Sequence, residues 1–417
     1  MNSSATTPVS RVTAVWSLAG LVLLTVNLRA AITGITPVLG ELRDVFGLSG
    51  AEVGVLTTLP VLCLGGFAGV APAVARRLGT ETAIAASLVM ITAGIVLRVV
   101  ESPVSLFVGT VLAGAGIAMG NVLMPAVIKR AFPSRVGSLT GLAMMLMAAS
   151  GAVAAGLAVP LDEAGGWRLA LAVWAVPSLA AVLVWGPLAL RGRRAPAAPA
   201  PAPRGEGTLL RSPIAWYVAA FMGLTSLMFY VLMSWLPEIM RDAGFAPAAA
   251  GMMVSVMMIV GIPLGFAVPV FAARLRDQRP VIAGVAVTMA AGLAGLLLAP
   301  SAGWAWAVVL GIGTGSAFPL AYTLLSLRSP SPSAAAGLSG MAQTGGYLLA
   351  GAGPLAVGVL HDATGGWHVP IVLLLVLLVP EIAFGLLAAR PGYVRPAAPR
   401  PRPEKAPAAL EPAARTR

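Results

Sequence analysis

The sequence predicts an all-α polytopic membrane protein in which twelve transmembrane helices form two pseudo-symmetric six-helix bundles. Three observations support this prediction. The 417 residues are 58% hydrophobic and only 10% charged, apolar runs recur along the whole chain, and loop motifs of the first half return in the second half. Soluble domains carry about 25% charged residues, so this composition excludes an ordinary soluble protein.

Each predicted helix corresponds to a run of about 20 mainly apolar residues, which is long enough to cross the hydrocarbon core of a bilayer. The first six runs fall near residues 14–39, 51–74, 82–100, 104–127, 137–160 and 168–190. The second six fall near residues 213–237, 247–273, 280–299, 303–326, 335–360 and 367–389. The first run is longer than the apolar part of a signal peptide, so we expect it to remain as a helix.

The loops between these runs show an internal repeat. "RDVFGLSGAEVG" is echoed by "RDAGFAPAAAG", "PAVARRL" by "PVFAARL", "LTGLA" by "LSGMA", and "LDEAGGWR" by "LHDATGGWH". The four matches occur in the same order at a nearly constant offset, which chance similarity between apolar helices does not explain. Two parallel six-helix halves joined by a linker are the arrangement of the major facilitator class of secondary transporters.

The repeat and the composition divide the chain into five segments. We expect a short N-terminus, a first bundle, a linker, a second bundle and a disordered tail, over residues 1–13, 14–190, 191–212, 213–390 and 391–417. The linker contains "RGRRAPAAPAPAPRGEG", whose Pro and Arg content can neither bury a core nor span a membrane.

The net charge of +12 is informative through its distribution. With the N-terminus inside, most Lys and Arg fall on one side, and only Arg43, Arg98, Arg168 and Arg241 fall on the other. The positive-inside rule therefore predicts that both termini are cytoplasmic. We expect a multi-pass protein of the cell (inner) membrane, with lipid around it and no nucleic-acid partner.

Arg29 lies within the first apolar run. A charge at that depth costs at least about 2.5 kcal/mol, so its presence indicates a function. Thr25, Arg29 and Thr33 are four residues apart and share one helix face, which predicts a wet cavity wall. A guanidinium can hold an anion through paired hydrogen bonds. The alternative is a structural arginine bonded to carbonyls or hydroxyls.

Polar residues on other helices complete the predicted solute site. Tyr230, Gln343 and Tyr347 are candidate hydrogen-bonding or stacking walls, and Asn121 is a further candidate on the fourth helix. Glu381 is the candidate proton relay because it is the one acidic residue well inside a predicted helix. A weak-acid solute could also carry its own proton, which would make protons the coupling ion without a relay.

Two short loops are candidate gating elements. The first carries Arg76 and Arg77, and the second carries Asp277. No cluster of His, Cys or paired carboxylates appears within the apolar runs, so we predict neither an enzyme, a metal site nor a cofactor. We expect the protein to act as a monomer.

Several phrases resemble one branch of a known family. "NLRAAITGITPVL", "GIAMGNVLMPAVIKRAFP", "FYVLMSWLPEI" and "LSGMAQTGGYLLAGAGPLAVGVLHDATGGW" are similar to the cyanate permease and nitroimidazole transporter branch of the major facilitator superfamily. The resemblance implies the fold of that superfamily, alternating access and small-molecule transport. One departure is that Arg76 stands where the superfamily's loop between helices 2 and 3 normally has an Asp, so the usual charge-relay role of that loop is not carried over.

These features together indicate a secondary active transporter that binds a small solute at a midplane site. The solute is predicted to be a small anion, cyanate-like, or a small polar heterocycle, and Arg29 is predicted to recognise it. Efflux of a neutral drug-like compound, with a structural Arg29, is the main alternative. A receptor built on a transporter fold is the other, although the linker and tail are too poor in apolar residues to form an output module.

Overall fold

The computed structural model describes residues 11–194 and 209–394, and within these ranges every regular element is a helix. The predictions for residues 1–10, 195–208 and 395–417, which cover most of the N-terminus, linker and tail, lie outside the described residues. Runs of apolar residues form helices because a helix satisfies its own backbone hydrogen bonds where no water is present.

The described residues of the first half form eight α-helices, of which α2 and α4 have only eight residues each. They are α1 (Arg11–Thr33), α2 (Leu39–Phe46), α3 (Gly50–Ala68), α4 (Ala71–Leu78), α5 (Thr80–Arg98), α6 (Pro103–Ala131), α7 (Val136–Ala172) and α8 (Ala175–Arg194). The described residues of the second half form the α-helices α10 (Pro213–Asp242), α11 (Pro247–Arg274), α12 (Arg279–Leu298), α13 (Gly303–Leu327), α14 (Pro332–Thr364) and α15 (His368–Ala388).

These helices give twelve membrane crossings, which confirms the predicted fold class. Among the described residues, nine segments are long and apolar enough to cross a membrane, and the bent pair α3 and α4 makes a tenth. The stretch from residue 133 to residue 190 counts as one segment there but holds two crossings, because the backbone leaves the helix at Gly165 and Gly166. The 33-residue helix α14 supplies the remaining crossing.

Several predicted boundaries were wrong, among them those of the first, second and fifth runs. The run at 51–74 is two helices bent by 52°, because Pro72 has no N–H to bond the Ala68 carbonyl. The run at 14–39 ends at Thr33, and a 3₁₀ turn leads into the unpredicted helix α2. The run at 137–160 continues as a helix until Gly165. Hydropathy measures apolar content and does not register such breaks.

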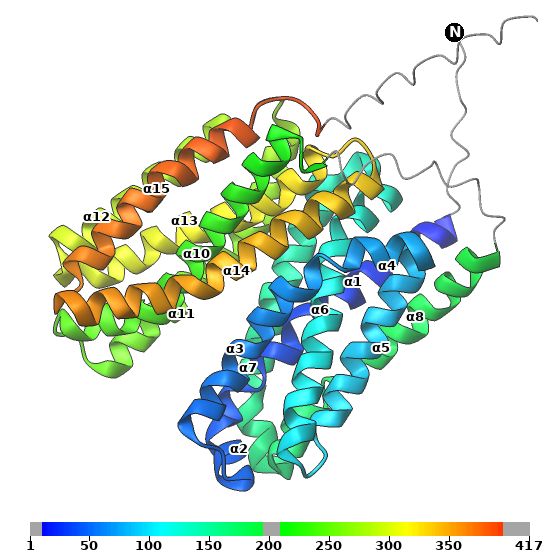
Figure 1. Cartoon of the computed structure of the whole chain (residues 1–417), viewed down its shortest axis with the longest axis horizontal. Coiled ribbons are helices and arrows are strands. Elements are labelled where there is room, and N and C mark those ends of the chain that lie inside the picture. Colours follow the sequence, from blue (N-terminus) through cyan, green and yellow to red (C-terminus); the bar gives the residue numbers. More distant parts are fainter. Residues whose placement is uncertain (1–10, 195–208, 395–417) are drawn as a thin grey trace, which may run out of the picture.

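Figure 1 shows two bundles, one of α1 to α8 and one of α10 to α15. They lie close together at the end that carries α4 and diverge toward the end that carries α2 (Figure 1). We refer to the first as the basic end, because Arg76, Arg77, Lys129, Arg130 and Arg135 lie there, and to the second as the α2 end.

The two bundles touch along the half of the molecule nearest the basic end. Gly141 of α7 approaches the backbone of α11 so closely that a Cβ at this position would lie 2.6 Å from the Phe266 carbonyl oxygen. Lys129 of α6 donates a hydrogen bond of 2.8 Å to the Ser326 carbonyl of α13. The structure is therefore closed at the basic end, and the space between the bundles opens toward the α2 end.

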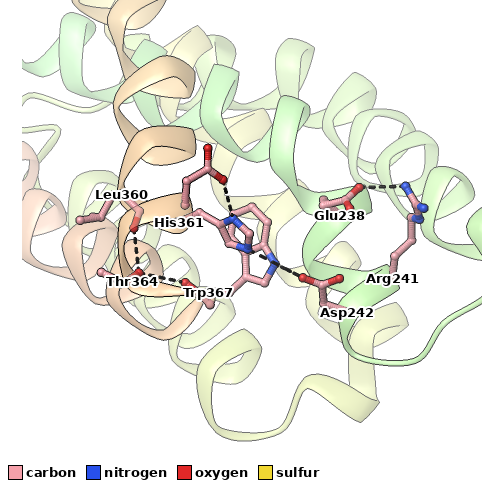
Figure 2. Close-up of polar contacts among 9 residues, drawn as sticks. Glu238, Arg241, Asp242, Leu360, His361, Thr364 and Trp367 are labelled. Carbon is pink, nitrogen blue, oxygen red and sulfur yellow. Dashed lines mark hydrogen bonds and ion pairs between the residues drawn. The ribbon is translucent and has the colours of Figure 1, made fainter.

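A polar clasp joins the helices of the second bundle at the α2 end (Figure 2). The Trp367 indole donates a hydrogen bond of 2.7 Å to Asp242, which ends α10. The His361 ring lies tilted against Trp367, with centroids 4.1 Å apart, and its Nδ1 lies 3.4 Å from the Asp362 carboxylate. The clasp fixes the end of α14 against the end of α10, and α10 also lines the cavity described below.

The first bundle has a different contact at this end, between the carboxyl groups of Glu41 on α2 and Asp162 on α7. The pKa of Glu41 is raised above the ordinary value of 4.5, first by a hydrogen bond with Asp162, then by burial and by the Asp162 charge. A raised pKa means that the folded protein holds more protons than the unfolded chain above pH 4.5, so stability falls as pH rises through this range.

We therefore expect Glu41→Gln to raise the melting temperature at pH 7.5 and to leave it nearly unchanged at pH 4.5, because the amide keeps the hydrogen bond without the charge. Thermal unfolding of the detergent-purified protein at both pH values measures this. Glu163→Gln, at an exposed neighbouring position, is the control and should behave like the wild type. Equal pH dependence in Glu41→Gln and the wild type would contradict the prediction.

Candidate functional site

A cavity of about 540 Å³ lies between the two bundles. Helices α1 and α7 form its wall on one side, and α10, α11 and α13 form the other. This volume is typical of small-molecule sites, which range over about 300 to 1,000 Å³. Three of these helices, α7, α11 and α13, also make the contacts between the bundles at the basic end, so a change in the packing of the bundles changes access to the cavity.

Most of the wall is apolar and adaptable. Its methionines and phenylalanines are Met144, Met147, Met233, Met257, Met258, Phe229 and Phe318. Methionine side chains are flexible and polarisable and make favourable contacts with aromatic rings. The polar groups are few, and they are Arg29, Thr33, Tyr230, Ser255 and Thr314. Arg29 is the only formally charged residue among the described residues that line the cavity.

The position of Arg29 is set by its contact with α7. Gly151 of α7 leaves room for the arginine stem, since a Cβ on Gly151 would lie 2.8 Å from Arg29 Cγ. The Thr33 hydroxyl donates to the Gly151 carbonyl at 3.0 Å and lies 3.2 Å from the Arg29 carbonyl. In the described ranges, no hydrogen bond from the Arg29 guanidinium to a protein acceptor is present, so its donors are available to a ligand.

Tyr230 lines the opposite wall, on α10. Its ring meets Phe229 edge to face, with centroids 5.5 Å apart. Tyr347 of α14 is 5% exposed, does not line the cavity, and lies near Tyr230 and Arg29. The structure thus brings Arg29, Thr33 and Tyr230 together around one cavity, with Tyr347 in the next layer.

The other predicted site residues lie away from the lining. Thr25 is fully buried and donates to the Val22 carbonyl, rather than to the guanidinium that it was predicted to support. Asn121 and Gln343 are 3% and 1% exposed and lie where α6 meets α14, between the bundles. Gln343 donates to the Asn121 carbonyl at 3.3 Å and to the Ser339 hydroxyl at 2.6 Å.

Glu381 is buried inside the second bundle, 1% exposed, and its Oε1 accepts a hydrogen bond of 3.0 Å from Thr225 of α10. Its other oxygen is buried without a partner among the described residues. Of the predicted gating residues, Arg76 and Arg77 lie at the end of α4, and Asp277 accepts a hydrogen bond of 3.0 Å from the Arg279 amide. All three lie at the basic end.

Sequence reasoning missed a buried cation behind Arg29. Arg98 was assigned to the outer surface, but it is 2% exposed and donates to the Ala31 carbonyl of α1 and to Thr110 of α6 at 3.1 Å. It therefore anchors the segment of α1 that carries Arg29. The signal was present, because Arg98 is three residues from Ile95 and seven from Ile91, on the buried face of α5.

The described residues contain no group of three or more His, Cys, Asp or Glu side chains placed to hold a metal ion. The cavity offers a guanidinium, hydroxyls and an aromatic wall. Such a set can bind and orient a small solute.

Comparisons with known proteins agree with this fold. A model of the Major Facilitator Superfamily matches residues 21–354. The chain is 39% identical to the 2-nitroimidazole transporter of Escherichia coli (strain K12), over 91% of this chain and 96% of that protein. It is 30% identical to the cyanate transport protein CynX of the same organism, over 83% and 90%. The solved structure of FucP in the outward conformation has a TM-score of 0.72 at 14% identity, covering 89% of this chain and 98% of that one.

Proposed function

This chain belongs to the Major Facilitator Superfamily and is a multi-pass membrane transporter of small solutes, and we propose that its solute is a small anion or a small polar heterocycle that binds Arg29. The transporter alternates between two states, in which the cavity between the bundles is open at one end or at the other. The solute binds in one state and leaves in the other. A single chain encloses the cavity, which supports action as a monomer.

The observation that carries this proposal is the chemistry of the cavity. Arg29 is the one formal charge among the described lining residues, and no carboxylate stands there to neutralise it. A cation would be repelled, whereas an anionic or strongly accepting group can take two parallel hydrogen bonds from the guanidinium. Tyr230 and the methionine wall then hold the apolar body of the solute.

The proposed transport step uses the charge of Arg29. When the bundles close over the solute, the guanidinium leaves water, and an isolated charge there is unfavourable. A bound anion neutralises it and so stabilises the occluded state relative to the empty one. The positive-inside rule supports a cytoplasmic basic end, and the structure then corresponds to a state open to the outside.

We further propose that protons travel with the solute, since no acidic residue lines the cavity in the described part of the chain. Glu381 then serves to hold α15 against α10 through Thr225. We expect Glu381→Gln to retain uptake driven by a pH gradient within about twofold, because the amide oxygen still accepts from Thr225. Uptake into proteoliposomes with an acidic exterior measures this.

Two controls accompany that experiment. Thr225→Val removes the hydrogen bond without removing the carboxyl group. It should lower the melting temperature, while uptake stays close to that of the wild type. Solute exchange without a pH gradient measures transport that needs no coupling. If Glu381→Gln abolishes pH-driven uptake but keeps exchange, Glu381 is a proton relay. The proposal that the proton travels with the solute is then wrong.

One observation favours a second candidate function. The cavity wall holds five methionines and two phenylalanines, which would accept a neutral heterocycle with little contribution from Arg29. In that case the protein exports a neutral drug-like compound and Arg29 is structural. The absence of a protein partner for the guanidinium among the described residues argues against this, because a structural arginine is normally fully hydrogen-bonded.

The test is uptake of radiolabelled cyanate, benzoate and 2-nitroimidazole into proteoliposomes, with benzamide as a neutral analogue of benzoate. The proposal expects accumulation of at least one anion or heterocycle and no accumulation of benzamide. Empty liposomes give the background. Equal transport of benzoate and benzamide would overturn recognition of an anionic group and would favour the second candidate.

A further inference from the structure

Helix α6 contains a backbone carbonyl, that of Asn121, that cannot accept a hydrogen bond from its own helix. In an α-helix the carbonyl of residue 121 would accept from the amide of residue 125, but residue 125 is a proline and has no N–H. Asn121 is 3% exposed, so water does not serve this carbonyl in the present state. A buried carbonyl without a partner is strongly disfavoured, so a donor must come from elsewhere.

Both donors come from the other bundle. The Tyr322 hydroxyl of α13 donates a short hydrogen bond to the Asn121 carbonyl, and Gln343 of α14 donates to it at 3.3 Å. Gln343 is oriented by its second bond, of 2.6 Å, to Ser339. Tyr322, Gln343 and Ser339 are at most 1% exposed. One carbonyl of the first bundle thus holds two helices of the second.

This contact lies between the cavity and the closed basic end. Phe318, one helical turn before Tyr322, lines the cavity. On the opposite side, Ser326, one turn after Tyr322, accepts from Lys129 of α6. Opening the basic end requires α6 to separate from α13 and α14, which breaks both bonds to the Asn121 carbonyl. Water entering from the basic end would then replace them.

We propose that the Asn121 carbonyl, freed by Pro125, is a latch that holds the basic end closed, and that Tyr322 and Gln343 are the donors that release it when the basic end opens. The latch depends on a backbone atom, so the identity of the side chain at 121 matters less than the proline at 125. It also goes beyond solute recognition, because it acts on the bundles and needs no bound solute.

The latch connects to the solute site through α13. Phe318 lines the cavity and lies one helical turn before Tyr322 on this helix. A solute that displaces the cavity wall at Phe318 would therefore also displace Tyr322, which gives solute binding a short physical path to the bonds that keep the basic end shut.

The test measures the distance between the bundles with pairs of spin labels. The single native cysteine is removed as Cys63→Ser. Ser134→Cys and Ser333→Cys, both exposed at the basic end, report on one bundle each. A second pair, Ala164→Cys and Ala363→Cys, is exposed at the α2 end. Double electron–electron resonance on the detergent-purified protein without solute gives the open and closed populations.

Two variants weaken the latch in different ways. Tyr322→Phe removes one donor, and Pro125→Ala supplies a helical N–H that competes for the Asn121 carbonyl. Each is expected to raise the ratio of open to closed basic ends by about fivefold, the equivalent of one ordinary hydrogen bond. The pair at the α2 end should show the opposite change. Pro125→Ala also favours helix formation, so it keeps the test valid if Tyr322→Phe folds poorly.

Thr323→Val is the matched control. Thr323 is a fully buried hydroxyl on the same helix, but it donates to the Pro319 carbonyl of its own helix at 2.7 Å. Its loss should leave both distance distributions as in the wild type. The proposal is overturned if a folded Tyr322→Phe or Pro125→Ala protein shows wild-type distances, or if Thr323→Val shifts them equally. Neither result depends on which solute is transported.

Discussion

Replacing Arg29 by Gln is expected to abolish accumulation of the transported anion, with a fall in uptake efficiency of about 100-fold or more. The reason is the loss of two charge-assisted hydrogen bonds in a cavity that holds no other formal charge among its described lining residues. Such bonds contribute about 1.5 to 3 kcal/mol each, and 2.7 kcal/mol already corresponds to about 100-fold. Initial uptake rates in proteoliposomes over a range of solute concentrations measure the effect.

Arg29→Lys separates charge from geometry. Lysine keeps the positive charge but lacks the planar fork, so we expect uptake between that of the wild type and that of Arg29→Gln. Both variants should elute as monodisperse protein and keep the wild-type melting temperature within a few degrees. If folded Arg29→Gln transports as well as the wild type, the arginine is structural and recognition of an anion is wrong.

Replacing Gly151 by Val is expected to reduce uptake by about 10- to 100-fold without touching the solute directly. A Cβ on Gly151 would lie 2.8 Å from Arg29 Cγ, near the root of the side chain, where rotation of the distal part cannot relieve the contact. The guanidinium must therefore move, and a displacement of about 1 Å in a positioning group can cost about 100-fold. Uptake kinetics and the melting temperature measure the effect.

The same helix provides a matched control for Gly151→Val. A Cβ added at Gly156, also on α7, would meet no atom within 4 Å. Gly156→Val should therefore transport as the wild type does, although it makes the same chemical change in the same helix. Gly151→Ala should lie between the two. Equal loss in Gly151→Val and Gly156→Val would show that stiffening of α7, rather than displacement of Arg29, causes the defect.

The length of the apolar runs predicted most of the fold, because runs that must cross a bilayer have few alternatives. The internal repeat added the grouping into halves. The failures concentrate where a single residue interrupts the backbone. Pro72 bends the second crossing, and Gly165 and Gly166 end the fifth. A window of hydropathy averages over such residues, so it places the helices correctly and their ends less well.

The site was predictable only in part, for a similar reason. Spacing placed Thr25, Arg29 and Thr33 on one face, and the structure puts Arg29 and Thr33 at the cavity while Thr25 bonds within α1. Helical spacing gives the direction of a side chain but not the distance to the next helix. Gln343 and Asn121 therefore meet each other between the bundles, through a backbone carbonyl that no side-chain pattern describes.

The most direct test of solute recognition is the dissociation constant of the best-transported solute for the wild type and for Arg29→Gln, measured by isothermal titration calorimetry on the detergent-purified proteins. Binding is measured without transport, so coupling and gating do not enter. We predict that Arg29→Gln weakens binding by about 100-fold or more, as the loss of two charge-assisted hydrogen bonds requires. An unchanged dissociation constant in folded Arg29→Gln would contradict the role of Arg29 as the partner of the solute.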